Sequence, residues 1–240
     1  QHGEVIPVPT SHLNYVRHVP YGVVGQITPW NAPMFTCAWQ LAPAMAAGNG
    51  VVLKPSELTP FSSVVIAKLL ESGGLPKGLT NIVNGLGKST GAALTDHPAI
   101  SKLVFVGSPQ SGRMIAEAGA RRLVPSVLEL GGKSANIVFA DAKLDEAVAG
   151  AQAAIFAAAG QSCVAGSRLL IERSVFEQVT SRLARAAEQI AVGLPSDEAT
   201  RMGPLQNRRQ FEQATRMIEA AEAAGARVLT GGKRPEGLPD

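Results

Sequence analysis

The sequence predicts an α/β fold in which a doubly wound, five-stranded parallel sheet is followed by an incomplete second α/β domain. Two observations lead to this prediction. Short apolar runs alternate with helical patterns from residue 21 onward, as is typical of βαβ units. The runs show no polar alternation, as expected of strands that are buried on both faces of a sheet. The chain of 240 residues is long enough for two modest domains with cores of their own.

The elements follow in chain order. Residues 4–6 and 14–17 alternate like short strands, so we interpret residues 1–20 as an extended β-arm outside the core. The five strands of the sheet are expected within 21–29, 50–55, 80–85, 102–107 and 126–131. The helices between them are expected at 32–47, 59–72, 88–95 and 109–120.

The same rhythm restarts after residue 132, which predicts a second α/β unit over residues 133–240. Its strands are expected within 134–139 and 167–173. Its helices are expected at 144–158, 174–192 and 205–224, and the last of them leads to the segment 226–230.

Composition excludes several classes of protein. Charged residues are 17%, aromatic residues 5% and the net charge is +3. Because no stripe of basic and aromatic residues is present, we expect no nucleic-acid partner. The longest apolar stretches, 41–53 and 147–160, are interrupted by Pro and Gly or are mostly Ala, so neither is expected to span a membrane. The two cysteines, Cys37 and Cys163, form no disulfide framework, which favours a reducing, cytoplasmic compartment.

Polar or glycine-rich residues follow all five predicted strands. Because open parallel sheets bind ligands at the carboxyl ends of their strands, their joint presence predicts a ligand site at one edge of the sheet. The stretches are PWNAP (29–33), KPSE (54–57), NGLG (84–87), GSP (107–109) and ELGGKS (129–134).

Two of these turns are candidates for phosphate contact. NGLGKSTG (84–91) lacks the first glycine of a P-loop, since Ile82 stands in its place, and we interpret it as a tight strand-to-helix turn. FVGSPQSG (105–112) is the better candidate. There Gly107 permits close backbone approach, and Ser108 begins a helix whose N–H groups could bind a pyrophosphate. A plain serine N-cap is an equally good interpretation of that spacing.

Other polar residues also allow two interpretations. Lys54 and Glu57 could bind ribose hydroxyls, or they could form an ordinary surface salt bridge. The residues alone favour the salt bridge. Glu129 precedes two glycines within an apolar strand. Partial desolvation there would raise its pKa, as a general base at neutral pH requires, or it could be a buried structural Glu. Asn31 could be a helix N-cap or donate its amide to an oxyanion.

Cys163 lies in AAAGQSCVAGSRLL (157–170), between Gly160 and Gly166. The small neighbours leave room for something to approach the thiol, whereas Cys37 lies beside Phe35 in a predicted helix and is interpreted as a core residue. No CxxC pair or nearby histidine accompanies Cys163, so we expect no metal site and no Cys–His dyad. A cofactor charge, a local dipole or Glu129 would have to activate this thiol.

Five stretches together resemble signatures of the NAD(P)-dependent aldehyde dehydrogenase family, over about residues 2–232. They are GQITPWNAP, VVLKPSELTP, FVGSPQSGR, LELGGKSANIVF and GQSCVAGSR, in the family's order. The resemblance implies that residues 21–132 are the dinucleotide-binding, Rossmann-like domain, and that residues 133–240 are the N-terminal part of a catalytic domain. It implies that Cys163 is the nucleophile, Glu129 the base that activates water, and Asn31 the amide of the oxyanion hole, with the Cys163 backbone N–H as its partner.

The resemblance also assigns the cofactor positions, with NAD favoured over NADP because Glu57 would repel a 2′-phosphate. Ribose contacts are implied for Lys54 and Glu57, and contacts along the dinucleotide for Trp30, Gly107, Ser108, Leu130 and Gly131. The implied reaction oxidises an aldehyde to a carboxylic acid through a thiohemiacetal and a thioester on Cys163. Transfer of the acyl group to coenzyme A is an alternative that Glu129 disfavours.

The chain departs from the family in extent. A helical segment before residue 1 is missing, and so are the later ExFGP motif and last strand, while residues 2–20 match half of an oligomerisation ribbon. The resemblance therefore implies a homo-oligomer, a dimer or tetramer, for the full-length protein. We expect the 240-residue chain alone to bind NAD weakly and turn over little, so a catalytically silent dinucleotide-binding or oligomerising fragment remains the second interpretation.

Overall fold

The computed structural model describes residues 2–235 and 237–238. The chain divides into two compact units, Gln1–Leu130 and Gly131–Asp240. The first unit begins with an antiparallel pair, β1 (Glu4–Ile6) and β2 (Asn14–Val16), in which Glu4 pairs with Val16. All six residues of the pair are exposed. This is the extended arm that the alternation predicted.

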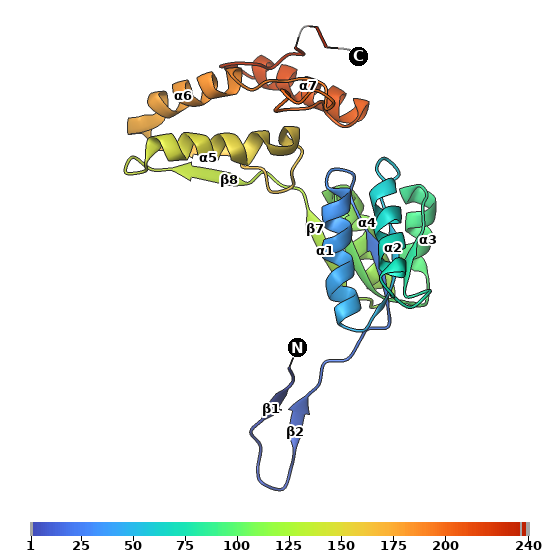
Figure 1. Ribbon diagram of the computed structural model, residues 1–240. Coiled ribbons are helices and arrows are strands. Elements are labelled where there is room, and N and C mark those ends of the chain that lie inside the picture. The colour runs from blue at the N-terminus through green and yellow to red at the C-terminus, as the bar shows by residue number, and fades with distance from the viewer. Residues whose placement is uncertain (1, 236, 239–240) are drawn as a thin grey trace. The chain divides into compact units, whose positions relative to one another are not determined.

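The predicted five-stranded parallel sheet is confirmed, and Figure 1 shows the helices α1 to α4 packed around it. Its strands are β3 (Val23–Ile27), β4 (Gly50–Lys54), β5 (Thr80–Ile82), β6 (Ile100–Gly107) and β7 (Ser126–Leu130). They lie in the order β5-β4-β3-β6-β7, and every neighbouring pair is parallel. The first strand of the sheet in sequence, β3, is thus its central strand. Strands β4 and β5 lie on one side of β3, and β6 and β7 lie on the other.

Helices connect these strands close to where the sequence predicts them. They are α1 (Pro33–Ala46), α2 (Phe61–Ser72), α3 (Ala92–Asp96) and α4 (Pro109–Arg121). A π-helical turn, η1 (Gly87–Gly91), runs directly into α3, so the predicted helix at 88–95 is a π-turn joined to one short α-helix.

Two hydrophobic clusters show that helices cover both faces of the sheet. Val51 and Leu53 of β4 pack with Leu41 of α1 and with Ile66 of α2. Val52, between them in sequence, packs with the cluster of Leu94 (α3), Ile115 (α4) and their neighbours. Because alternate side chains of a strand point to opposite faces, α1 and α2 cover one face and α3 and α4 the other. Cys37 of α1 is fully buried in the first cluster, as predicted, and burial raises the pKa of its thiol.

A buried amide closes the first βαβ segment. The Asn49 Oδ1 accepts hydrogen bonds from the backbone N–H groups of Tyr21 (2.7 Å) and Gly22 (3.1 Å), and its Nδ2 donates to the Ala44 carbonyl (3.0 Å). One side chain therefore joins the entry to β3, the last turns of α1 and the start of β4.

The second unit contains a parallel pair, β8 (Ala135–Val138) and β9 (Arg168–Ile171), with helices α5 (Leu144–Phe156), α6 (Phe176–Glu188) and α7 (Arg208–Ala223). The short turn η2 (Ala157–Gly160) follows α5, and the short turn η3 (Arg173–Val175) precedes α6. Its core is formed by Val138, Val148 and Val179 with partly buried neighbours.

The end of α6 and the segment after α7 differ most from the expected elements. The helix expected at 174–192 ends at Glu188, because Val192 instead forms a parallel bridge with Met202. The segment 226–230 after α7 is not a strand. It finds no strand to pair with among the described residues, and its apolar side chains Val228 and Leu229 are exposed.

The core of the first unit provides a stability prediction. Leu53 is 0% exposed at the centre of its cluster, so Leu53→Ala should lower the free energy of unfolding by about 2–5 kcal/mol. Leu69→Ala is the matched control, because Leu69 is 64% exposed on α2 and its loss should change stability by less than about 0.5 kcal/mol. Urea denaturation followed by circular dichroism measures both. Equal effects of the two substitutions would contradict this assignment of the core.

Candidate functional site

The carboxyl ends of the parallel strands bring the first unit's candidate residues to one edge of the sheet. Ile27 at the end of β3 is level with Lys54 on one side and with Phe105 on the other. Gly107 at the end of β6 is level with Leu130 at the end of β7. The turns that follow these positions therefore share the edge at which parallel sheets bind ligands.

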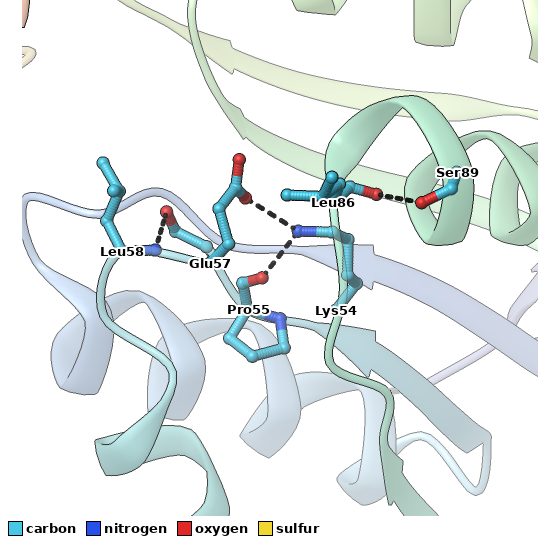
Figure 2. Close-up of polar contacts among 7 residues, drawn as sticks. Lys54, Pro55, Glu57, Leu58, Leu86 and Ser89 are labelled. Carbon is cyan, nitrogen blue, oxygen red and sulfur yellow. Dashed lines mark hydrogen bonds and ion pairs between the residues drawn. The ribbon is translucent and has the colours of Figure 1, made fainter.

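Lys54 is a deeply buried polar residue at this edge. Its side chain is 2% exposed, and its Nζ donates to the Pro55 carbonyl (2.8 Å) and to the Glu57 Oε2 (3.3 Å), as Figure 2 shows. The aliphatic stem passes Gly91 of η1, where an added Cβ would lie 3.6 Å from Lys54 Cδ. An ordinary surface salt bridge is therefore the wrong interpretation of this pair, because one partner is enclosed in the fold.

Glu57 is the partly exposed partner, with 45% of its side chain accessible. Burial by itself would raise the pKa of this carboxyl. Hydrogen bonds from its own backbone N–H and from the Lys54 ammonium, together with the ammonium's charge, outweigh burial and lower the pKa below its usual value. The carboxylate thus stays ionised at neutral pH with one face toward solvent, where it can accept further hydrogen bonds.

The turn after β3 contains Trp30 and Asn31, both half-buried. The Trp30 carbonyl accepts a hydrogen bond from the Thr59 hydroxyl (3.2 Å), which joins this turn to the one after β4. Helix α1 has Ala32 at its N-cap, with no side-chain cap, and Pro33 in its first turn. The N-cap interpretation of Asn31 is therefore wrong.

Ser108 caps helix α4, as its spacing predicts: its Oγ accepts from the Ser111 N–H at 3.2 Å. Pro109 has no N–H, and the N–H groups of Ser111 and Gly112 both donate to Ser108. Among the first-turn donors, the Gln110 N–H therefore remains without a partner in the described helix. The fold itself requires a glycine at position 107, because an added Cβ would lie 2.5 Å from the Phe105 ring.

Glu129, Leu130 and Gly131 lie at the end of β7 and beyond it. The expected partial burial of Glu129 is wrong: β7 is an edge strand of the sheet, and the Glu129 side chain is exposed. Leu130 packs against Gly112 of α4, where an added Cβ would come within 2.6 Å of it. Gly131 has open space around its Cα.

Cys163 lies in the second unit, on a tight turn between η2 and β9, and is exposed. The Ala165 N–H donates to the Ser162 carbonyl (3.3 Å), and the Val164 N–H donates to the Ser162 Oγ (3.4 Å). The Cys163 N–H donates to no group of the described residues. The turn therefore presents a thiol and an available N–H donor next to each other.

Both glycines around Cys163 serve the backbone itself. Gly160 has φ +73°, in the left-handed region. Gly166 packs against α5, because its N–H donates to the Ala154 carbonyl (3.0 Å) and an added Cβ would lie 3.2 Å from the Ala154 Cβ. From the sequence, these glycines were expected only to leave room for a ligand to approach the thiol. Their roles in the backbone depend on contacts that appear only in the fold.

Neither a metal cluster nor a membrane span occurs in the part of the chain that the structure describes. No group of three or more His, Cys, Asp or Glu side chains there could hold a metal ion. No helix among those residues is long and apolar enough to cross a membrane.

Comparisons with known proteins agree with this fold. Human retinal dehydrogenase 2 is 43% identical over 233 residues, which are 97% of this chain and 45% of that protein. The crystal structure of PnpE in complex with nicotinamide adenine dinucleotide matches with a TM-score of 0.95 and 45% identity, over 98% of this chain and 48% of that one. The NAD+ complex of aldehyde dehydrogenase from Bacillus cereus matches with a TM-score of 0.95 and 42% identity, over the same shares.

The chain thus spans about half the length of the relatives it matches. The sequence profile of the aldehyde dehydrogenase family matches residues 1–240, the whole of it. The chain belongs to the aldehyde dehydrogenase family.

Proposed function

We propose that the protein carrying this chain oxidises an aldehyde to a carboxylic acid with NAD(P), and that Cys163 is its nucleophile. The observation that supports this most directly is the turn of Cys163, which exposes the thiol beside an available backbone N–H. The other cysteine, Cys37, is fully buried and has a raised thiol pKa. A nucleophile must be reachable and able to form the thiolate, so Cys163 fits the role and Cys37 does not.

The strand-end edge of the first unit fits NAD. An ionised Glu57 can accept from two vicinal ribose hydroxyls, and the Lys54 ammonium uses two of its three N–H groups on described residues. The same negative charge would repel the 2′-phosphate of NADP. Along the rest of the dinucleotide we assign contacts to Trp30, Gly107, Ser108, Leu130 and Gly131. PnpE and the Bacillus cereus enzyme, which were solved with this dinucleotide, support the assignment.

The chemistry begins at Cys163. Its thiolate adds to the aldehyde carbon, and the Asn31 amide and the Cys163 N–H donate to the resulting oxyanion. A bound nicotinamide would accept the hydride that this thiohemiacetal loses. A thioester on Cys163 would then remain. Glu129 then takes a proton from water, whose oxygen adds to the thioester carbon. Collapse of this second adduct breaks the carbon–sulfur bond, releases the carboxylic acid and restores the thiolate.

The exposed Glu129 carboxylate can reach water, as a base that activates water must, but it lacks the partial burial from which the sequence predicted this role. Cys163 and Glu129 belong to different units of the chain, so the proposal requires that both reach the same substrate. The exposed apolar side chains of the arm, among them Val5, Leu13 and Tyr15, support the assembly of the full-length protein into a homo-oligomer.

A second candidate follows from the chain's extent. Because it spans about half of its relatives, the 240 residues by themselves could act as a dinucleotide-binding or oligomerising unit without turnover. A family member that transfers the acyl group to coenzyme A is the third candidate, and product analysis with and without that thiol distinguishes it.

Alkylation tests the role of Cys163. Iodoacetamide should modify one thiol per chain, at Cys163 rather than Cys37, because only Cys163 is exposed. NAD should slow the reaction if the cofactor lies against the thiol. In the full-length protein, Cys163→Ser should lower kcat by at least about 1,000-fold, with Cys37→Ser as the matched control. Full activity of the Cys163→Ser protein would contradict the assignment.

Cofactor preference tests Glu57. Glu57→Gln should raise KM for NAD by about 10-fold, as expected for losing charge-assisted hydrogen bonds, and should lower KM for NADP. Because the pKa of Glu57 is lowered below the usual value of a glutamate, its contribution to NAD binding should be complete at neutral pH and lost as the pH falls through the lowered value. Glu71→Gln is the control, because Glu71 is an exposed residue of α2. An unchanged NAD-to-NADP ratio would count against the ribose role.

Turnover by the 240-residue chain alone tests the second candidate. With a simple aldehyde and NAD, the 240-residue chain should give no steady-state NADH above background, while the full-length protein does. Isothermal calorimetry should still detect weak NAD binding by the 240 residues. Sustained NADH production by this chain without added protein would overturn the fragment interpretation.

A further inference from the structure

An unusual backbone precedes the Cys163 turn. Ala158 (φ +53°), Ala159 (φ +54°) and Gly160 (φ +73°) form a left-handed turn directly after α5. Residues with a Cβ disfavour this region, and runs of such residues are rare. Such a conformation persists only where surrounding contacts hold it in place, and it occurs often at functional sites.

Gln161 supplies contacts of that kind. Its backbone N–H and its side-chain Nε2 both donate to the Ala158 carbonyl, each at 3.1 Å. The first bond closes the left-handed turn and the second reinforces it with the side chain of the same residue. Gln161 therefore binds the turn from the position two residues before the thiol.

The other end of the Gln161 amide reaches a distant segment. Its Oε1 accepts from the Gln206 N–H at 2.9 Å. Gln206 in turn accepts from the Asn207 Nδ2 (2.7 Å), and Asn207 caps α7 by accepting from the Gln210 N–H (3.0 Å). The turn is thus connected to the start of a helix of 16 residues.

We propose that Gln161 is a positioning residue for Cys163, an inference that rests on the proposed nucleophilic role of that thiol. On the N-terminal side, Gln161 joins the turn to the start of α7. On the C-terminal side, the Gly166 N–H joins it to the Ala154 carbonyl of α5. Between these two attachments the Cys163 N–H and sulfur keep one orientation toward a bound carbonyl. Without the Gln161 amide, the left-handed residues can relax toward right-handed backbone and change that orientation.

The test compares three variants of the full-length protein. Gln161→Ala removes the side-chain bonds to the Ala158 carbonyl and to the Gln206 N–H, and Gln161→Glu keeps the acceptor for the Gln206 N–H but loses the donor to Ala158. Gln178→Ala, at an exposed position of α6, is the matched control. Readouts are kcat and KM, the urea midpoint, and amide hydrogen exchange of residues 158–166.

Gln161→Ala should lower kcat about 10-fold, less than the roughly 100-fold that a misplacement of about 1 Å can cost, and should speed the exchange of residues 158–166. KM for NAD and the urea midpoint should stay as in the parent protein. Gln161→Glu should fall between the two, and Gln178→Ala should change nothing.

Unchanged kcat and exchange in Gln161→Ala would overturn the positioning role. A parallel fall of kcat and the urea midpoint, without faster local exchange, would also overturn it, since Gln161 would then serve only global stability. If Cys163→Ser keeps full activity while Gln161→Ala still speeds exchange, the proposed nucleophile has failed and the contact of Gln161 with the turn has not.

Discussion

Parallel alignment of the five strands is the constraint on which the first unit's candidate site depends. Since all strands run in the same direction, every carboxyl end falls on one edge, and the residues that follow meet there although they are up to about 100 positions apart in sequence. Helices on both faces then exclude water from the sheet, which is why Lys54 can be enclosed at a strand end and still direct its ammonium to that edge. Side chains on separate antiparallel hairpins would share no such edge.

The fold was predictable where burial alone sets the pattern. Val23–Ile27, Gly50–Lys54 and Ile100–Gly107 lie in the interior of a sheet, and such strands show mostly apolar runs without regular polar alternation, which leave little choice of structure. Element ends were less predictable, because they depend on partners elsewhere in the chain. The apolar pattern of α6 continues through Val192, but pairing with Met202 redirects the backbone after Glu188. Residues 226–230 carry a strand-like composition without a described strand to pair with.

Site chemistry was predictable by residue type more than by environment. A cysteine among small residues and a carboxylate at a strand end could be found by reading along the chain. The burial of Lys54 could not, because the glycine that borders its stem comes 37 positions later, at Gly91. The exposure of Glu129 follows from β7 being an edge strand, which is a property of strand order. Gln161 lies within the GQSCVAGSR stretch, but its contacts could not be read from the sequence, because its partners are a carbonyl three residues back and an N–H 45 residues ahead.

The closure made by Asn49 has a consequence for how sequences of this fold can diverge. The position needs one acceptor oxygen for two N–H groups and one donor for a carbonyl, and the asparagine amide offers the two functions on separate atoms. Aspartate would turn a second acceptor toward the Ala44 carbonyl, and serine would be too short to span the three contacts. An asparagine retained here through long divergence would therefore record the architecture of a βαβ crossover rather than selection for catalysis.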